Sequence, residues 1–260
     1  QEIANILGYT LITLNCNQYT SPLDILGGQT ITGYQEGKVS QAWSNKIVLE
    51  DGTTQDVNGV VLLLDELPKI DPNTAGILND ALAKVKQYKI DKASGSLIPP
   101  KIENGRGIKL SLGNLVIIGT GNVALNTIDP DYEANFKQDL SLQDRFVGST
   151  YKVLYDYEYE FSSLMRGYAF IWIFCVKIRE AIIAQKATNQ AFVSMRLMEN
   201  IRETYKTYRE NLINKAANSA ISEPKTIIDS FETFFSLFKP IPKESIISAV
   251  KIDEFKKIVR

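Results

Sequence analysis

The sequence predicts an α/β fold, in which a parallel sheet flanked by helices is followed by an all-α part. Two aliphatic runs without polar alternation, VVLLL at 60–64 and LVII at 115–118, are typical of strands buried on both faces of a parallel sheet. From about residue 156 the strand pattern stops, and helical segments punctuated by prolines follow. We therefore divide the chain into an α/β core at 1–155 and a helical domain at 156–260.

The first part of the chain alternates helical and extended patterns. QEIANIL at 1–7 is typical of a helix that Gly8 ends, and TLITLN at 10–15 is typical of a strand. Residues 17–37 are rich in Gly, Thr, Ser and Gln, so we expect a long exposed loop there. The predictions that follow are a short helix at 38–43, a hairpin at 46–57 with its turn at Asp51-Gly52, and the buried strand at 60–64.

The rest of the core and the tail follow the same reasoning. The spacing of Ile77, Leu78, Leu82 and Val85 predicts a helix over 73–88. The remaining core predictions are a loop at 91–100, a hairpin at 101–112 around Asn104-Gly105, a strand at 115–120, a short helix at 139–145 and a last strand at 151–155. The tail is expected to hold four helices, at roughly 158–186, 191–217, 224–238 and 244–258.

Composition excludes several classes of site. The chain has 260 residues, of which 44% are hydrophobic, and a formal net charge of -1, which does not favour nucleic acid or an anionic membrane as a partner. It contains no histidine, which excludes Ser–His–Asp catalysis and imidazole metal sites. Cys16 and Cys175 are expected to be reduced thiols of a cytoplasmic protein.

The most apolar stretch lies in the predicted helical tail. Residues 168–176 are far fewer than the ~20 that a membrane-spanning helix needs, so no membrane span is predicted. Phe170, Trp172 and Phe174 lie in this stretch, and we expect them to form core rather than a ligand site.

Two carboxylates follow the first buried strand. Asp65 and Glu66 stand at its C-terminal end, where ligands bind in parallel sheets. One carboxylate at such a place can hold Mg²⁺, usually through water, and the next can orient an attacking water molecule. The alternative is a strand that simply ends in acidic surface residues.

The second buried strand ends in Thr120-Gly121-Asn122. If the two strands are neighbours, a polar side chain there lies beside the carboxylates, and Asn122 can hydrogen-bond an attacking water or a terminal phosphate. An asparagine next to a glycine is also typical of a simple β-turn.

Two arginines complete the candidate set. Arg145 ends the short helix in LQDRF, and an arginine supplied across a subunit boundary stabilises charge on a transferred phosphoryl group. Arg196 lies in the first turn of a helix that Ser194 can cap, and a helix N-terminus favours anions. Each is also compatible with an ordinary solvated arginine.

The order strand–DE, strand–GTGN, DRF and a helical tail with SMR resembles the AAA+ ATPases, and more closely their MoxR, CobS and dynein-related branch. TSPLDILGG at 20–28 and DPNTAGILNDAL at 71–82 resemble that branch as well. The resemblance implies a P-loop NTPase-type sheet with an all-α lid, and ATP and Mg²⁺ as cofactors. The roles that it implies are Walker B for Asp65, which holds Mg²⁺ through water, and for Glu66, sensor 1 for Asn122, arginine finger for Arg145 and sensor 2 for Arg196.

One motif of the family does not occur in these residues. GxxxxGK[ST] cradles the phosphates with its backbone N–H groups, but Gly37-Lys38, the one Gly-Lys pair, is followed by Val39. The family pattern places this Walker A loop just before Gln1, so we expect an N-terminal truncation. A fragment without the first core strand is expected to be poorly stable and unable to hydrolyse ATP, because the flanking strands would face a gap.

The resemblance implies a chaperone-like ATPase that acts in a homo-oligomeric ring, by family a hexamer. Its client would be a protein, including a VWA-domain partner or a metal-cofactor enzyme. Tyr34 in the glycine-flanked segment 27–37 is a candidate pore residue, with a packed loop anchor as the alternative, and the hairpin near Arg106 could line the pore or contact a neighbour. Two other functions stay open: an McrB-like nucleic-acid motor that uses ATP or GTP, and a non-catalytic scaffold subunit.

Overall fold

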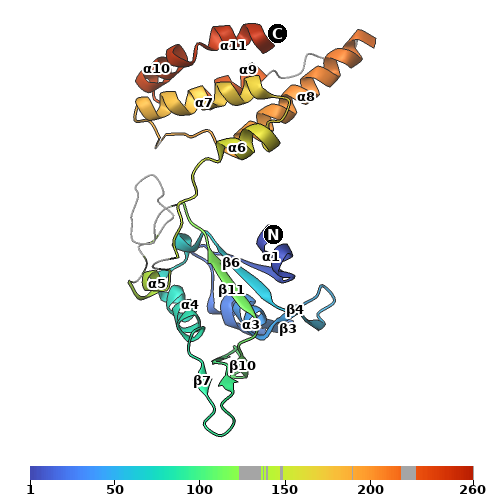
Figure 1. Cartoon of the computed structure of the whole chain (residues 1–260), viewed down its shortest axis with the longest axis vertical. Coiled ribbons are helices and arrows are strands. Elements are labelled where there is room, and N and C mark those ends of the chain that lie inside the picture. Colours follow the sequence, from blue (N-terminus) through green and yellow to red (C-terminus); the bar gives the residue numbers. More distant parts are fainter. Residues whose placement is uncertain are drawn as a thin grey trace. The chain divides into compact units, whose positions relative to one another are not determined.

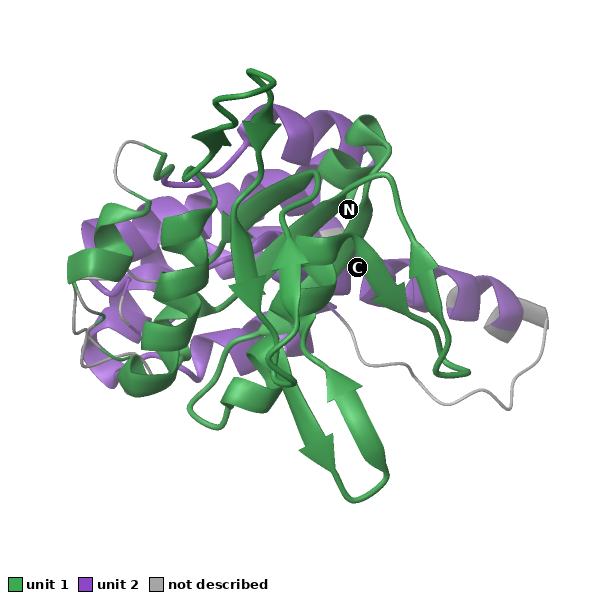
Figure 2. Cartoon of the chain, turned by 90° about the horizontal axis from the view of Figure 1, so that it is seen from below, with its two compact units in different colours: residues 1–151 green, residues 152–260 purple. Residues whose placement is uncertain are grey.

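The structure is a computed structural model, and it describes residues 1–122, 136, 138, 140–146, 149–188, 190–217 and 227–259 of the chain. The chain divides into two compact units, 1–151 and 152–260, and Figure 2 colours them separately. Each unit has a hydrophobic core of its own. Over the described ranges, every helix is too short or too polar to cross a bilayer.

Unit 1 is built around a parallel sheet of three strands. They are β1 (Thr10–Asn15), β6 (Val60–Asp65) and β11 (Leu115–Gly119), in the order β1-β6-β11 (Figure 1). Val60 pairs with both Thr10 and Leu115, so the strands start level with one another. Their carboxyl ends therefore meet at one edge of the sheet. The two aliphatic runs are confirmed as parallel strands, and they are neighbours. The central strand β6 is almost entirely buried, but β11 is only half-buried, so the expectation of burial on both faces was wrong for β11.

Helices pack around this sheet and share its core. α1 (Glu2–Leu7) ends at Gly8, whose φ of 66° is left-handed, as predicted. α3 (Lys38–Ser44) buries Trp43, and α4 (Pro72–Lys84) buries Leu78, both in the core that holds Leu62 of β6. The Asp71 carboxylate fixes the start of α4, because it accepts from the backbone N–H groups of the first turn. Two shorter helices of this unit are η1 (Leu67–Lys69) and α5 (Leu140–Asp144).

The described part of unit 1 carries four small hairpins. Two were predicted: β4 (Lys46–Val48) with β5 (Thr54–Asp56), and β9 (Lys101–Glu103) with β10 (Lys109–Ser111). The expected loop at 17–37 was wrong, because it holds α2 (Pro22–Leu26) and the hairpin of β2 (Gly27–Thr30) with β3 (Gly33–Glu36). The expected loop at 91–100 likewise contains β8 (Leu97–Ile98), which pairs with β7 (Lys89–Ile90).

Unit 2 is helical in its described part, as predicted. Its elements are α6 (Tyr157–Tyr159), the π-helix η2 (Glu160–Leu164), α7 (Ala169–Ala184), α8 (Met195–Ala217), α9 (Ile227–Phe235), α10 (Pro240–Val250) and α11 (Ile252–Val259). Aromatic rings fill its core, with Phe174 of α7 stacked at 3.9 Å between centroids on Phe255 of α11. Phe170 and Trp172 are half-buried against the same core, so the prediction that they are packing residues is confirmed.

Three predicted elements differ from the structure, each for a local reason: one strand is absent and two helices are divided. Residues 151–155 form no strand, because they pair with neither edge of the sheet and a strand needs a neighbour for its backbone groups. The helix expected at 158–186 is interrupted near Gly167, whose φ is 83°. The helix expected at 244–258 is two helices that meet at Lys251, with a φ of 53°, and the first begins at Pro240, where proline suits a helix start.

A buried ion pair links segments of unit 2. Arg179 of α7 donates to both carboxylate oxygens of Glu160, at 2.7 and 2.8 Å, and the two side chains are 1% and 0% exposed. Arg179 Nε also donates to the Val193 carbonyl at 2.9 Å. The ring centroid of Tyr155 lies 3.6 Å from the guanidinium carbon. This cluster of four residues, the Arg179 clamp, therefore joins the first residues of unit 2, α7 and the segment before α8.

Both cysteines are free thiols, which agrees with the prediction, and both are buried. Burial raises the pKa of Cys175 and of Cys16 to about 12, and the charge of Asp65 adds to the effect at Cys16. Because the thiolate is the reacting form, we expect iodoacetamide to leave both thiols of the native chain unmodified at neutral pH. Mass spectrometry should find two modified cysteines only after denaturation. Rapid alkylation of the native chain at either residue would contradict this expectation.

Candidate functional site

The carboxyl edge of the sheet brings a carboxylate and a hydroxyl into contact. Asp65 ends β6, and Thr120 directly follows β11. Thr120 Oγ1 donates to Asp65 Oδ1 at 2.5 Å and accepts from the Glu66 N–H at 3.1 Å. Backbone bonds from Thr120 N to Leu64 O and from Leu67 N to Thr120 O keep the two segments side by side past the last strand residue. The orientation of the Asp65 carboxylate is therefore fixed by the neighbouring strand.

Glu66 turns the chain sharply after β6. Its φ of 54° and ψ of 40° are left-handed, a conformation that few residues other than glycine adopt and that costs on the order of 1 kcal/mol. Its carboxylate lies 2.6 Å from Lys69 Nζ, and its side chain is 44% exposed. The conformation directs the Glu66 side chain away from the path of the strand, and the ion pair holds it against η1.

Asn122 and Arg145 lie on other segments of unit 1. Asn122 is exposed two residues after Thr120. Arg145 is exposed just after α5, and its Nε donates to Asn79 Oδ1 of α4 at 3.3 Å. Asn79 in turn donates to Ser141 Oγ at 2.7 Å, so α4 and α5 orient the arginine together. Within the described residues, Arg145 has no contact with Asp65 or Glu66.

Arg196 belongs to unit 2. It is the second residue of α8 and is exposed. Ser194 Oγ accepts from the Leu197 N–H at 3.1 Å, so the predicted cap of this helix is confirmed. The capped N-terminus and the adjacent guanidinium present two features that favour an anion.

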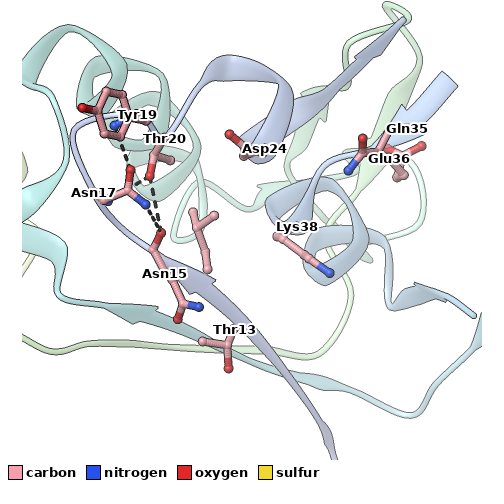
Figure 3. Close-up of a pocket in the computed structure, with 10 residues that line it drawn as sticks. Thr13, Asn15, Asn17, Tyr19, Thr20, Asp24, Gln35, Glu36 and Lys38 are labelled. Carbon is pink, nitrogen blue, oxygen red and sulfur yellow. Dashed lines mark hydrogen bonds between the residues drawn. The ribbon is translucent and has the colours of Figure 1, made fainter. Parts of the chain in front are cut away.

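A polar cavity of about 320 Å³ lies at the carboxyl end of β1 (Figure 3). It is lined by residues of β1, of the loop that follows, of α2 and of β3, and by Lys38 at the start of α3. Asn17 fixes this loop, because its side chain accepts from the Tyr19 N–H at 2.8 Å and its own N–H donates to Thr20 Oγ1 at 2.9 Å. The loop leaves Tyr19 81% exposed, a residue that the sequence analysis did not single out.

Tyr34 is half-buried on β3 of the β2–β3 hairpin, where it pairs with Gln29 near the turn. The guanidinium carbon of Arg106 lies 3.9 Å from its ring centroid, and its hydroxyl donates to the Leu26 carbonyl at 3.4 Å. Ile31, at the turn of the same hairpin, is fully exposed. The hairpin therefore presents an aliphatic side chain at its tip and packs its aromatic one against the loop of the β9–β10 hairpin.

The sheet, the flanking helices and the acidic strand end agree with one protein family. Residues 1–146 match the family model of the AAA domain, dynein-related subfamily, which is more than half of the 260-residue chain. The chain belongs to this family. No curated protein matches it. Its α/β unit is accordingly an AAA+ core, the helices of unit 2 are consistent with the helical lid, and the family is one of nucleotide-binding ATPases.

The oxygen groups at the strand ends of this AAA+ core fit Mg²⁺ bound together with a nucleotide. Asp65 supplies a half-buried carboxylate, Thr120 a hydroxyl, and Asn15 lies level with Asp65 on β1. In the described part of the chain, no group of three or more Asp, Glu, Cys or His side chains could hold a metal ion by itself. Mg²⁺ is commonly bound by one or two carboxylates plus substrate phosphates, and this donor set suits that arrangement.

Sequence reasoning missed two partners of the acidic pair. Thr120 lies within the quoted GTGN motif, so its position at the strand end was visible while its contact with Asp65 was not. Lys69 stands three residues after Glu66, a spacing at which side chains on one helical turn meet. Both contacts depend on how the chain turns after β6.

Thr120→Val tests the hydroxyl bridge of this AAA+ core. The substitution keeps the side-chain shape but leaves the Asp65 carboxylate without its donor, so we expect a loss of about 1 kcal/mol in the free energy of unfolding. Thr120→Ser retains the hydroxyl, so its free energy of unfolding should be close to that of the unchanged chain. Urea denaturation of the three proteins measures the difference. Equal stabilities of the valine and serine variants would show that the bridge contributes nothing.

Proposed function

We propose that the protein hydrolyses ATP in a homo-oligomeric ring and uses this cycle to remodel a client protein, as in the MoxR and CobS branch of the AAA+ ATPases. The observation that carries the proposal is the arrangement of Asp65, Thr120 and Glu66 at the carboxyl edge of a parallel AAA+ sheet. Ligands of such sheets bind at this edge.

Each residue of the edge has a distinct role in the proposal. Bound Mg²⁺ would neutralise charge on the phosphates, and Asp65, oriented by Thr120, would hold it through water. Glu66 would orient the attacking water, which requires its carboxylate to leave Lys69. Asn122 would position the same water or the terminal phosphate.

Two arginines would complete the site from other parts of the assembly. Arg145 is exposed and oriented by Asn79, which suits an arginine that acts in the site of the neighbouring subunit of a hexamer. Arg196, at the capped start of α8, would sense the γ-phosphate from the lid. A ring is required because Arg145 cannot serve its own site in this scheme.

The client would be a protein in the cytoplasm, with a VWA-domain or metal-cofactor protein as the family-type partner. The β2–β3 hairpin is the proposed pore element. Ile31 at its tip supplies an exposed apolar contact, and the Tyr34 ring packs the hairpin against Arg106 of the β9–β10 loop.

A scaffold subunit is the second candidate, because GxxxxGK[ST] does not occur among these 260 residues. A subunit that binds no phosphate could still assemble through Arg145 and the hairpins. A scaffold subunit does not require the Asp65 carboxylate to be oriented by the neighbouring strand. We therefore favour the ATPase over the scaffold.

The deciding experiment starts from the coding DNA upstream of the Gln1 codon. We expect it to encode an aliphatic strand that runs into GxxxxGK[ST]. The protein from the complete reading frame should then release phosphate from ATP and form a closed ring in analytical ultracentrifugation with ATP. A complete reading frame without the loop, or an intact protein that forms rings without turnover, would overturn the ATPase in favour of the scaffold. Turnover that requires added DNA would favour the nucleic-acid motor.

A further inference from the structure

α4 and the β9–β10 hairpin enclose a groove that the proposed ATP cycle does not use. Its volume is about 1040 Å³, and residues of β7 and β8 together with Leu26 also line it. The groove has an apolar floor, since Ile102 and Ala81 are buried and Ile77 is half-buried beneath it. All of its lining residues belong to unit 1.

One wall of the groove is a free strand edge. In the β9–β10 pair, Asn104 N donates to Ile108 O at 3.0 Å and Leu112 N donates to Pro100 O at 2.9 Å. In an antiparallel pair, every second residue directs its backbone N–H and C=O toward the partner strand. Ile102 therefore directs these groups toward Leu110 of β10, whereas Lys101 and Glu103 direct theirs toward the other edge of β9. Over the described ranges, those groups have no hydrogen-bond partner. Two residues of β9 can therefore accept an added strand.

The same edge already binds backbone at one end, where α2 ends and β2 begins. Gly105 continues the alternation of Lys101 and Glu103, and its N–H donates to the Leu26 carbonyl at 3.1 Å. A Cβ on Gly105 would collide with the Gly27 carbonyl, so the two backbones approach closely. A segment laid along β9 would extend this pairing into the groove beyond Leu26.

The rim of the groove is basic, although the whole chain has a net charge of -1. Lys89, Lys101 and Lys109 line it, and all three are exposed and have no carboxylate partner within the described residues. Lys84 also lines the groove and is bound to Asp80 at 2.7 Å. The other lining carboxylate, Glu103, has no cation partner among the described residues. The lysines that line the groove therefore outnumber its carboxylates.

We propose that this groove binds an extended, acidic segment of a partner protein, which adds a strand to the free edge of β9. Main-chain bonds to Lys101 and Glu103 would give the register, as in other cases of strand addition. Because side chains alternate along a strand, acidic residues would face the lysines while aliphatic residues cover the floor near Ile102. The groove binds its partner without nucleotide. The proposal for the groove can therefore be tested independently of the ATPase activity.

Fluorescence anisotropy on the full 260-residue chain tests the proposal, with a labelled peptide in which aspartate alternates with valine. We expect saturable binding that weakens with salt. The same peptide with lysine for aspartate should bind at least about tenfold more weakly, because like charges would meet at the rim. A copy with methylated backbone nitrogens keeps the charges but loses the strand donors, and it should not bind. Equal binding of the methylated copy would overturn strand addition.

Variants of the chain separate charge from the strand edge. Lys101→Glu with Lys109→Glu should weaken binding by at least about tenfold, whereas Lys239→Glu, a charge change of the same sign in unit 2, should not. Glu103→Pro removes an N–H that points away from β10, so the hairpin stays paired while binding is lost. Circular dichroism melts confirm that each variant folds. Binding that survives both changes, or duplex DNA that binds through these lysines while the peptide does not, would overturn the proposal.

Discussion

Glu66→Gln in the protein from the complete reading frame is expected to lower ATP turnover by about two to four orders of magnitude and to leave ATP binding intact. The amide keeps the size of the side chain but cannot accept a proton from the attacking water. Phosphate release measures turnover, and equilibrium binding of a fluorescent ATP analogue measures affinity. The variant should therefore collect in the ATP-bound state.

Two further variants show whether the effect belongs to the position of Glu66. Glu50→Gln neutralises an exposed carboxylate in the loop before β5 and should turn over ATP normally. Lys69→Met removes the cation that holds Glu66 at 2.6 Å, so turnover should not fall. If Glu66→Gln retained most of the activity, or Lys69→Met abolished it, Glu66 would not be the residue that orients water.

Arg179→Met is expected to destabilise unit 2 by about 3–5 kcal/mol, because it leaves the fully buried Glu160 carboxylate without its cation. The substitution also removes the bond to the Val193 carbonyl and the ring contact of Tyr155, so the segment before α8 should loosen. Urea denaturation followed by circular dichroism at helical wavelengths measures the loss.

The matched comparisons isolate the burial of this charge. Arg166→Met removes an exposed arginine of the same unit and should change stability little. Arg179→Met combined with Glu160→Leu removes both charges, and it should regain much of the loss, because no buried ion remains uncompensated. If the double variant were as unstable as the single one, the clamp would act through its packing and not through its charge.

The parts of the fold that the sequence predicted are those with strong local patterns. VVLLL and LVII are apolar at every position, a pattern typical of strands in a parallel sheet, although β6 is almost entirely buried and β11 only half-buried. The β2–β3 hairpin was missed because GGQT and GYQE carry the glycine and polar residues of a loop, and their pairing depends on Gly27 and Gly33 at positive φ. Residues 151–155 have β-forming side chains, but a strand also needs an edge to pair with, which no local pattern encodes.

In the candidate site, too, the residues with a local sequence signal were predicted and the contacts between distant residues were not. Asp65 and Glu66 could be found because a strand end is a local feature, whereas the bond from Thr120 joins residues 55 positions apart and follows from the register of β6 with β11. Lys69 was missed because Glu66 was expected to face a water molecule and not a neighbouring cation. Tyr34 was chosen for its glycine-flanked position, and its contact with Arg106 arises from another hairpin.

The chain has two tryptophans, and they fall one in each unit: Trp43 in the core of unit 1 and Trp172 against the core of unit 2. Trp43 is almost fully enclosed, while Trp172 lies edge-on to Phe161 at 5.0 Å between ring centroids. Each unit therefore carries its own intrinsic fluorophore. Trp43→Phe leaves an emission that reports on the lid alone, and Trp172→Phe leaves one that reports on the core alone. Comparing the red shifts of the two variants during denaturation would show whether core and lid unfold together or one after the other.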